Sequence, residues 1–343
     1  MTRKVLNTLY VMTEEAYLRR DHKTLVVEVD GEKTLQVPEH HLGSVVVFGR
    51  VLVSQGVYEW SAEKGKPITF LNTYGKFRGR FIGPTSGNVH LRVQQFERNK
   101  DDGFRVDTAK TMVAAKIQNT RFLLLRHARD RSQFQERLRN TETALGRILE
   151  ELKRADSLDD VRGKEGEASR LTFGVFDRMV TQNRDTFEMN GRNRRPPRDP
   201  MNAILSFLYT IIRHDITSAL ESVGLDYQVG FMHVLRSGRP ALSLDLMEEF
   251  RPVLGDRLAL TLVNRQQLKP EDFNHRSGGA VEMSEEGRKT LLEEYQNRKD
   301  AEVSHPVLEN PLPLGLVPQV QARLLARVIR GDLDEYPPFL YRG

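Results

Sequence analysis

The hydrophobic pattern of this 343-residue chain changes its period after about residue 94, and this change limits the possible folds more than any other feature. Before that point, apolar residues form short runs rich in β-branched and aromatic side chains, as strands do. After about residue 107 they recur every three or four positions, as on one face of a helix. The chain is therefore predicted to be a multidomain α+β protein. An N-terminal antiparallel β-sandwich (1–94) and a polar linker (95–106) precede a larger all-helical domain (107–343).

The N-terminal runs are separated by turn residues such as Asp30-Gly31 and Gly83-Pro84, which favour closely spaced strands. None of these runs contains a recognisable reaction centre. The predicted strands begin at Thr8, Thr24, Ser44, Val57, Ile68, Phe77 and Val89.

The C-terminal region carries helix-start signals at several places. Asp107 is expected to cap a helix that ends near Arg129. Ser157 forms a capping box with Asp160, and Asp199 precedes a proline suited to a first helical turn. The helix after Asp199 is apolar nearly all round and should be central and buried. Further helices are predicted over 132–154, 243–251, 252–264, 284–298 and 317–330.

The composition excludes several classes of protein. With 52 Lys and Arg against 47 Asp and Glu, the net charge is +5, which favours a polyanionic partner without proving one. The chain has no cysteine, so disulfides, zinc-thiolate sites and thiol nucleophiles are excluded, and a reducing cytosol suits it. No apolar stretch is long enough for a signal peptide or a membrane span. We therefore expect a cytoplasmic protein without a membrane partner.

A glutamate interrupts the apolar stripe of the helix that starts after Ser157. The stripe passes through Val161, Glu165, Ala168 and Thr172 at steps of four, three and four. A carboxylate on a buried face costs several kcal/mol unless it is paired or binds a cation. Glu165 is therefore either a metal ligand or one half of an ion pair with an arginine, and the pattern alone does not separate the two.

A second cluster lies between residues 230 and 252. His233 stands in apolar surroundings, and Asp245 and Glu248 are three residues apart, so a helix would place both on one face. Glu249 is expected to point away into solvent. Each feature is weak alone, but with Glu165 they predict an oxygen-rich divalent-cation site. The GxSxG, Walker, GxGxxG and HExxH motifs are all absent.

A proline-containing segment before the buried helix holds four arginines. Arg192, Arg194, Arg195 and Arg198 are expected to face water or a partner, because such a segment cannot pack in a core. It is either a solvated loop or a flexible arm that binds DNA phosphates.

Four motifs, in this order, resemble the universal integrase subunit of CRISPR adaptation, the first of the CRISPR-associated protein families. They are KEGEASRLTF around Glu165, DPMNAILSFLYTII around Tyr209, GFMH ending at His233, and SLDLMEEFRP around Glu248. The resemblance covers nearly the whole chain, and the joint occurrence of the motifs is far more specific than any one of them. The start, MTRKVLNTLYV, and the EEFRP ending are most similar to the subtype I-C branch.

The resemblance implies an N-terminal β-sandwich used in dimerisation, a helical catalytic domain and a catalytic set of Glu165, His233, Asp245 and Glu248. Glu165, His233 and Glu248 would bind Mg²⁺ or Mn²⁺, and the imidazole favours Mn²⁺. Many family members have aspartate at the position of Glu248, so the coordination geometry here can differ. Asp245 corresponds to the family's second acid, which lies at the site without always touching the metal.

The implied reaction is a transesterification on double-stranded DNA, in which the 3′-hydroxyl of a captured fragment attacks the edge of a CRISPR repeat. Arg236 and Arg239 are predicted to contact phosphates near the scissile bond. The implied partners are a second copy of the chain, a small ferredoxin-like protein and, in the I-C branch, a RecB-like exonuclease. A general metal-dependent nuclease and a non-catalytic DNA-binding scaffold are the alternatives.

Overall fold

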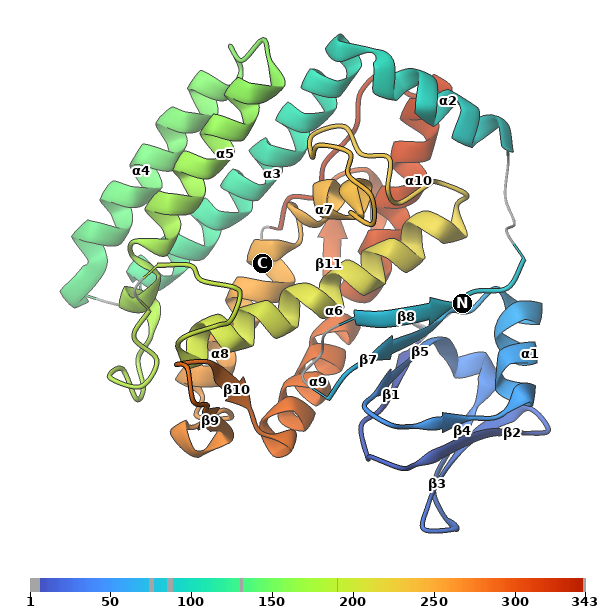
Figure 1. Ribbon diagram of the computed structural model, residues 1–343. Coiled ribbons are helices and arrows are strands. Elements are labelled where there is room, and N and C mark those ends of the chain that lie inside the picture. The colour runs from blue at the N-terminus through green and yellow to red at the C-terminus, as the bar shows by residue number, and fades with distance from the viewer. Residues whose placement is uncertain (1–6, 74–76, 85–88, 130–131, 190, 342–343) are drawn as a thin grey trace.

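A computed structural model describes residues 7–73, 77–84, 89–129, 132–189 and 191–341. Strands gather in the N-terminal part and helices dominate the rest, so the predicted α+β class and its order along the chain are confirmed (Figure 1). No helix in the described part of the chain is long and apolar enough to cross a membrane.

The N-terminal part contains two four-stranded sheets, and their strand pairing is mixed instead of antiparallel throughout. The first sheet has the order β1 (Asn7–Val11), β5 (Leu42–Phe48), β7 (Ile68–Leu71), β8 (Phe77–Phe81). In it β5 pairs in parallel with both β1 and β7, whereas β8 is antiparallel to β7. The second has the order β4 (Glu32–Pro38), β3 (Thr24–Val29), β2 (Tyr17–Asp21), β6 (Leu52–Val53). In it β3 pairs antiparallel with β2 and β4, whereas β6 runs parallel to β2.

Strand β5 explains how the two halves of the molecule are joined. Val45 and Val47 belong to the core between the N-terminal elements, whereas Val46 and Phe48 point to the opposite face and join the large helical core. A strand covered on both faces needs apolar residues at every position, and Val45–Phe48 meets this requirement. The Phe48 ring stacks on Phe207 of the central helix, with centroids 6.0 Å apart.

Two predicted strands are helices. The strand expected at Val57 lies in α1 (Gln55–Lys64), because Val57, Trp60 and Ser61 are buried at helical spacing and Gly65 ends the helix with a positive φ. The strand expected at Val89 lies in α2 (Val89–Lys100). Only one residue of its apparent alternation, Leu91, is buried, so the period of two was accidental. The sequence patterns also missed the short or polar strands β2, β4 and β6.

The segment predicted to be a linker, 95–106, is helical. It includes the end of α2 and the start of α3 (Asp102–Arg129), with one non-helical residue, Asp101, between them. Asp101 accepts the backbone N–H of Phe104 at 3.0 Å and so caps α3. The cap is thus Asp101 and not Asp107, and α3 is helical up to Arg129, the last residue described before 130–131.

The C-terminal part is built around α6 (Pro200–Ser222), whose residues Ile204, Leu208 and Ile212 have no exposed surface. Its predicted cap is confirmed, since Asp199 accepts the N–H of Asn202 at 2.7 Å. Helices α3, α4 (Gln135–Leu152) and α5 (Leu158–Phe173) lie side by side as a bundle (Figure 1). The bundle contacts the elements around α6 through α3, which packs on α7 (Ala241–Met247) and on residues 251–256. The other helices are α8 (Arg257–Asn264), α9 (Glu285–Asp300) and α10 (Val317–Arg330).

The prediction of an all-helical C-terminal domain is wrong in one respect. Two antiparallel pairs of strands accompany the helices, β9 (Phe273–His275) with β10 (Val281–Met283), and β11 (Glu302–His305) with β12 (Leu308–Pro313). These strands are only three to six residues long, which is short for a pattern of alternation to be recognised in the sequence. A π-helical segment, η4 (Arg251–Asp256), joins α7 to α8. Short 3₁₀ turns are η1 (Glu39–His41), η2 (Ser132–Phe134), η3 (Phe176–Met179), η5 (Pro270–Asp272) and η6 (Leu314–Leu316).

Candidate active site

A cavity of about 220 Å³ lies where α3, α5, α6 and the segment from α7 to η4 meet. Three of the four predicted acid and histidine residues, Glu165, His233 and Glu248, line this cavity although they are far apart in sequence. Asp245 is behind His233 and does not line it. The other lining residues are Lys116, Ile117, Thr120, Leu145, Ala168, Ser169, Thr172, Phe173, Arg194, Tyr209, Arg251 and Asp256.

Helix α5 presents Glu165 to the cavity as its apolar stripe predicts. Ser157 caps the helix by accepting the N–H of Asp160 at 3.2 Å. Val161 and Ala168 on the same stripe are buried, while the Glu165 side chain keeps 26% of its surface exposed because it faces the cavity. The stripe therefore fixes the direction of the carboxylate.

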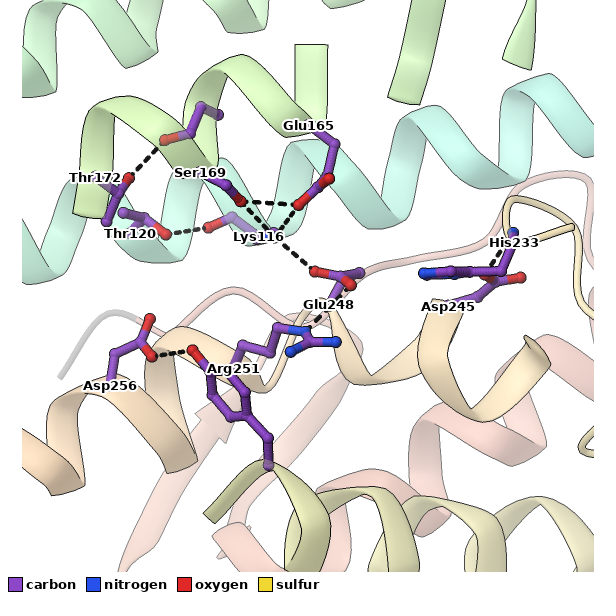
Figure 2. Close-up of polar contacts among 12 residues, drawn as sticks. Lys116, Thr120, Glu165, Ser169, Thr172, His233, Asp245, Glu248, Arg251 and Asp256 are labelled. Atoms are coloured by element: carbon purple, nitrogen blue, oxygen red, sulfur yellow. Dashed lines mark hydrogen bonds and ion pairs between the residues drawn. The ribbon is translucent and has the colours of Figure 1, made fainter. Parts of the chain in front are cut away.

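Lys116 of α3 lies between the two glutamates (Figure 2). Its Nζ forms an ion pair with Glu165 Oε1, lies 2.7 Å from Glu248 Oε2 and donates to Ser169 Oγ at 3.1 Å. The ion-pair interpretation of Glu165 is thus what the structure contains, with a lysine in place of the expected arginine. Both carboxylates converge on one positively charged atom.

Glu248 is the most enclosed of the acidic residues that line the cavity, with 4% of its side chain exposed. Arg251 donates its Nε–H to Oε1 at 3.1 Å. Burial alone would raise the pKa of Glu248, but the charges of Arg251 and Lys116 outweigh it and lower the pKa to about 2. Glu248 is therefore ionised at neutral pH in spite of its burial.

Asp245 orients His233. Its Oδ2 accepts the backbone N–H groups of Phe231 at 2.6 Å and Met232 at 3.0 Å, and its Oδ1 accepts that of His233 at 3.0 Å. Oδ1 also lies 2.5 Å from His233 Nδ1, and since this carboxylate accepts three backbone N–H groups, we assign Nδ1 as the donor of this contact. This arrangement leaves Nε2 as the free ring nitrogen, as a carboxylate behind a metal-binding histidine does.

Gly230 makes this arrangement possible. A Cβ at this position would lie 2.5 Å from Asp245 Oδ2 and 2.7 Å from the backbone carbon of Ala241. Any side chain would therefore push the loop that carries His233 away from the carboxylate.

Tyr209 and Asp256 form the cavity wall beside Arg251. The Tyr209 hydroxyl donates to Asp256 Oδ1 at 2.5 Å, and the Arg251 guanidinium lies 4.6 Å from the Tyr209 ring centre. Burial raises the pKa of Asp256 to about 6, although the hydrogen bond from Tyr209 and nearby cations act in the opposite direction. This wall orders Arg251 and thereby Glu248.

The four arginines before α6 do not behave alike. Arg192 is fixed to the protein, with Nη1 donating to Asn202 Oδ1 at 2.6 Å and Nη2 to Ser206 Oγ at 3.0 Å. The expectation that it faces water or a partner is therefore wrong, because side chains of α6 supply its acceptors. Arg194, Arg195 and Arg198 are exposed, and Arg194 lines the cavity.

Arg236 and Arg239 lie in the loop that follows His233, the first exposed and the second half-buried. Neither lines the cavity. Their predicted phosphate contacts stay a prediction.

Glu249 is not solvated as expected but completely buried. Its carboxylate accepts the hydroxyl of Tyr336 at 2.6 Å, the backbone N–H of Phe339 at 2.7 Å and Gln321 Nε2–H at 3.0 Å. Burial raises the pKa of Glu249 to about 7, although these hydrogen bonds lower it. Glu249 thus holds the C-terminal strap, defined here as residues 333–341.

Asn119 fixes the same strap to α3. Its Nδ2–H groups donate to the backbone oxygens of Glu249 at 2.9 Å and Phe339 at 3.0 Å, and its Oδ1 accepts the N–H of Tyr341 at 2.8 Å. Asn119 is three residues after Lys116, so the strap, Glu249 and the lysine-bearing turn of α3 form one connected unit.

The carboxylates of Glu165 and Glu248 and the imidazole of His233 are chemically suited to bind a divalent cation, but in this structure they are too far apart to surround one. Within the described ranges, no three His, Asp or Glu side chains are close enough together to surround a metal. Two carboxylates and one imidazole are nevertheless donors that Mg²⁺ or Mn²⁺ accepts. Glu165 and Glu248 already share the ammonium of Lys116, so a metal ion bound by both would have to replace this ammonium, and His233 would have to come closer to the two carboxylates.

Sequence reasoning missed Lys116, Ser169, Arg251 and Asp256. For Lys116 a signal existed, because it interrupts the apolar stripe of α3 between Met112 and Thr120 just as Glu165 interrupts that of α5. Arg251 and Asp256 belong to a π-helical segment with no readable period, so the same approach could not have found them.

The fold and the cavity define a mixed α+β protein whose helical part contains a site lined by two glutamates and a histidine. The family model of CRISPR associated protein Cas1 matches residues 9–297, and the chain belongs to this family. A "CRISPR-associated endonuclease Cas1 1" from Moorella thermoacetica is 51% identical over 98% of this chain and 99% of that protein. A "CRISPR-associated endonuclease Cas1 2" from Rhodospirillum rubrum is 48% identical over 99% of this chain and all of that protein. A Cas4/Cas1 fusion from Geobacter sulfurreducens is 34% identical over 97% of this chain and 60% of its own length.

Solved structures show the same fold. A Cas1 protein from Thermotoga maritima has a TM-score of 0.80 at 22% identity and covers 98% of this chain and 99% of its own. A casposase bound to an integration product has a TM-score of 0.81 at 19% identity, over 96% of this chain and 92% of its own. The chain also matches 36% of a chain in a Cas6-RT-Cas1–Cas2 complex, with a TM-score of 0.82 at 22% identity over 98% of this chain.

Proposed function

We propose that this chain is the integrase of CRISPR adaptation, which joins captured DNA fragments to CRISPR repeats. The observation that carries the proposal is the convergence of Glu165, His233 and Glu248 on one cavity in a member of the Cas1 family. The close relatives are named endonucleases, and integration and hydrolysis of DNA use the same phosphodiester chemistry.

In the proposed reaction, the 3′-hydroxyl oxygen of the fragment forms a bond to a phosphorus atom at the repeat edge. The bond from that phosphorus to the 3′-oxygen of the repeat strand breaks, and this oxygen leaves as a hydroxyl. One phosphodiester replaces another, so no oxidant or nucleotide cofactor is needed.

Glu165, Glu248 and His233 Nε2 would hold Mg²⁺ or Mn²⁺. Such an ion, when bound, polarises the phosphoryl oxygen and lowers the pKa of the attacking hydroxyl. Asp245 fixes the imidazole so that Nε2 is presented, and Arg251 keeps Glu248 ionised and in place. Asp245 therefore serves the reaction as a positioning residue.

The cavity and its mouth favour a polyanionic substrate. Lys116, Arg194 and Arg251 all line it and would offset the charge of a phosphodiester. The exposed Arg195 and Arg198, and Arg236 beyond His233, are proposed to contact double-stranded DNA further along its backbone.

The remaining expectations concern assembly and are part of the proposal. The N-terminal part (1–94) would form a β-sandwich dimerisation domain, and the C-terminal part (107–343) the catalytic domain. A small ferredoxin-like adaptation protein is the proposed partner, supported by the likeness of this chain to part of one chain in a Cas6-RT-Cas1–Cas2 complex. A RecB-like exonuclease, assignment to subtype I-C and a cytoplasmic location are proposed as well, and the Cas4/Cas1 fusion supports the exonuclease.

The test is a strand-transfer assay with purified protein, a duplex bearing 3′-hydroxyl ends and a supercoiled plasmid that carries a CRISPR repeat. We expect covalent joining at the repeat edges with Mn²⁺ or Mg²⁺, greater with the small partner, and none with EDTA. Cleavage of the plasmid without joining would indicate a general nuclease. DNA binding without either product would indicate a scaffold and overturn the proposal.

A further inference from the structure

The feature that the proposed function leaves unexplained is the lysine at the centre of the cavity. We propose that Lys116 is a resident cation that competes with the divalent metal for Glu165 and Glu248 and, once displaced, contacts the substrate phosphate. The inference rests on the proposed function and adds a residue to it.

The position of Lys116 on α3 is unusual for a lysine. It belongs to the buried stripe of the helix, and only 14% of its side chain is exposed. Burying an ammonium group costs several kcal/mol unless charged partners surround it. The partners of this ammonium are Glu165, Glu248 and Ser169, and all of them line the cavity (Figure 2).

The two oxygens of Glu248 have different partners. Oε1 accepts from Arg251, which is itself buried and packed on Tyr209. Oε2 is the oxygen that faces Lys116, at 2.7 Å. With Oε1 engaged by Arg251, Oε2 is the oxygen through which Glu248 can bind a metal, and Lys116 occupies its place.

The same competition applies at Glu165. Its Oε1 is engaged by Lys116 and also accepts the Ser169 hydroxyl at 2.8 Å. An ammonium group and a divalent ion cannot both occupy the space between two carboxylates, because their charges repel at such short range. The lysine therefore has to leave before both glutamates can bind one metal ion.

The displaced ammonium stays within the cavity. Its side chain enters from α3, and the Ser169 hydroxyl offers a neutral acceptor beside its present position. A cation held next to the metal position is suited to the extra negative charge that a phosphodiester gains in the transition state. Lys116 would thus weaken metal binding and strengthen catalysis.

These two roles predict opposite effects for one substitution. Lys116→Met keeps the length of the side chain and removes its charge. Its Kd for Mn²⁺ should fall by about tenfold or more, because the competing charge is gone. Its rate of strand transfer at saturating Mn²⁺ should fall by about 10²-fold, because a donor to the transition state is lost. Lys116→Arg keeps the charge and should retain weak metal binding.

The experiment is calorimetric titration with Mn²⁺, together with the strand-transfer rate, for the wild type, Lys116→Met, Lys116→Arg and Lys110→Met. Lys110 is on the same helix, pairs with Asp107 and does not line the cavity, so its variant should match the wild type. Unchanged or weaker Mn²⁺ binding by a folded Lys116→Met protein would overturn the inference. Tight Mn²⁺ binding without any strand transfer by the wild type would instead overturn the proposed function.

A second measurement needs no variant. In the wild type, reductive methylation of Lys116 followed by mass spectrometry should become several-fold faster on addition of Mn²⁺, while that of Lys110 should not change. Protection of Lys116 by Mn²⁺, or no change in its reactivity, would contradict displacement. Because this measurement uses the wild type, it tests the displacement of Lys116 by Mn²⁺ even if the Lys116→Met variant does not fold.

Discussion

Glu248 and Glu249 are adjacent and both buried, yet they occupy two regions with opposite electrostatics. Glu248 faces the cavity, where Arg251 and Lys116 lower its pKa to about 2 against the effect of burial. Glu249 faces the C-terminal strap, where burial raises its pKa to about 7 and its partners are neutral donors.

The difference shows what a cavity for cation chemistry requires. Hydrogen bonds from neutral groups satisfy the lone pairs of Glu249 but do not offset the cost of burying its charge. Two cations do offset it at Glu248 and keep the carboxylate ionised without filling its coordination capacity. The first arrangement anchors a chain segment, whereas the second is suited to exchange one cation for another.

The largest effect is expected from removing groups on the cavity side. Glu165→Gln and His233→Ala should each reduce strand transfer by at least about 10³-fold, beyond the 10- to 100-fold loss expected for Asp245→Asn, which only positions the imidazole. DNA binding and the unfolding midpoint should change little, because Glu165 and His233 are partly exposed. Rates of product formation and thermal melts measure this. Near wild-type activity of Glu165→Gln or of His233→Ala would show that the substituted residue is not part of the active site.

The next effect concerns stability on the strap side. Glu249→Ala leaves the Tyr336 hydroxyl and the Phe339 N–H without their acceptor and removes one of the acceptors of Gln321 Nε2, and should cost about 3 kcal/mol of unfolding free energy. Limited proteolysis should then cut the strap first. Glu335→Ala, an exposed site on the same strap, is the control and should change stability by less than about 0.5 kcal/mol. Equal stability of the two variants would mean that Glu249 does not anchor the strap.

The pH dependence of stability in EDTA should have opposite signs for the two glutamates. The folded-state pKa of Glu249 is raised, so its contribution is present below pH 4.5 and is lost as the pH rises through about 7. That of Glu248 is lowered, so its contribution is present above pH 4.5 and is lost as the pH falls towards 2.

In the wild type, Glu249 should lower the free energy of unfolding by up to about 1.4 kcal/mol per pH unit between pH 5 and 7. Glu249→Gln should therefore remove this decline. Denaturant unfolding at several pH values measures this slope. An unchanged slope in the variant would show that Glu249 is ionised throughout this range.

The smallest effect is expected for the arginines before α6, where Arg192 is hydrogen-bonded to the protein and the nearby Arg194, Arg195 and Arg198 are exposed. Replacing Arg194, Arg195 and Arg198 with glutamine should weaken DNA binding and flatten its salt dependence by up to about 2.7 log units per log unit of salt, at about 0.9 per phosphate contact. Arg192→Gln should instead lower stability and leave the slope unchanged, because Asn202 and Ser206 hold its guanidinium. Equal slopes for the triple variant and the wild type would remove this segment from the DNA path.

Much of the local structure could be predicted from the sequence because it depends on interactions between residues that are close together in the chain. The caps at Ser157 and Asp199, the two ends of α10 and the strands β3 and β7 follow from side chains within a few residues of each other. Glu165 was found in the same way, since an acid on an apolar stripe needs only helical periodicity to be noticed. The errors at Val57 and Val89 arose where a short apolar run satisfies both periods.

The sequence by itself determined the change from mainly strands to mainly helices along the chain, the absence of thiol chemistry and three of the acid and histidine residues that line the cavity. Only the tertiary structure decided that Lys116 lies between Glu165 and Glu248, that Glu249 is buried under the strap and that Arg192 is fixed while Arg194 is free. The first two outcomes depend on contacts between distant segments, since 49 residues separate Lys116 from Glu165 and 90 separate Glu249 from Phe339. No local pattern encodes such distances, because the packing of whole helices sets which side chains share a cavity.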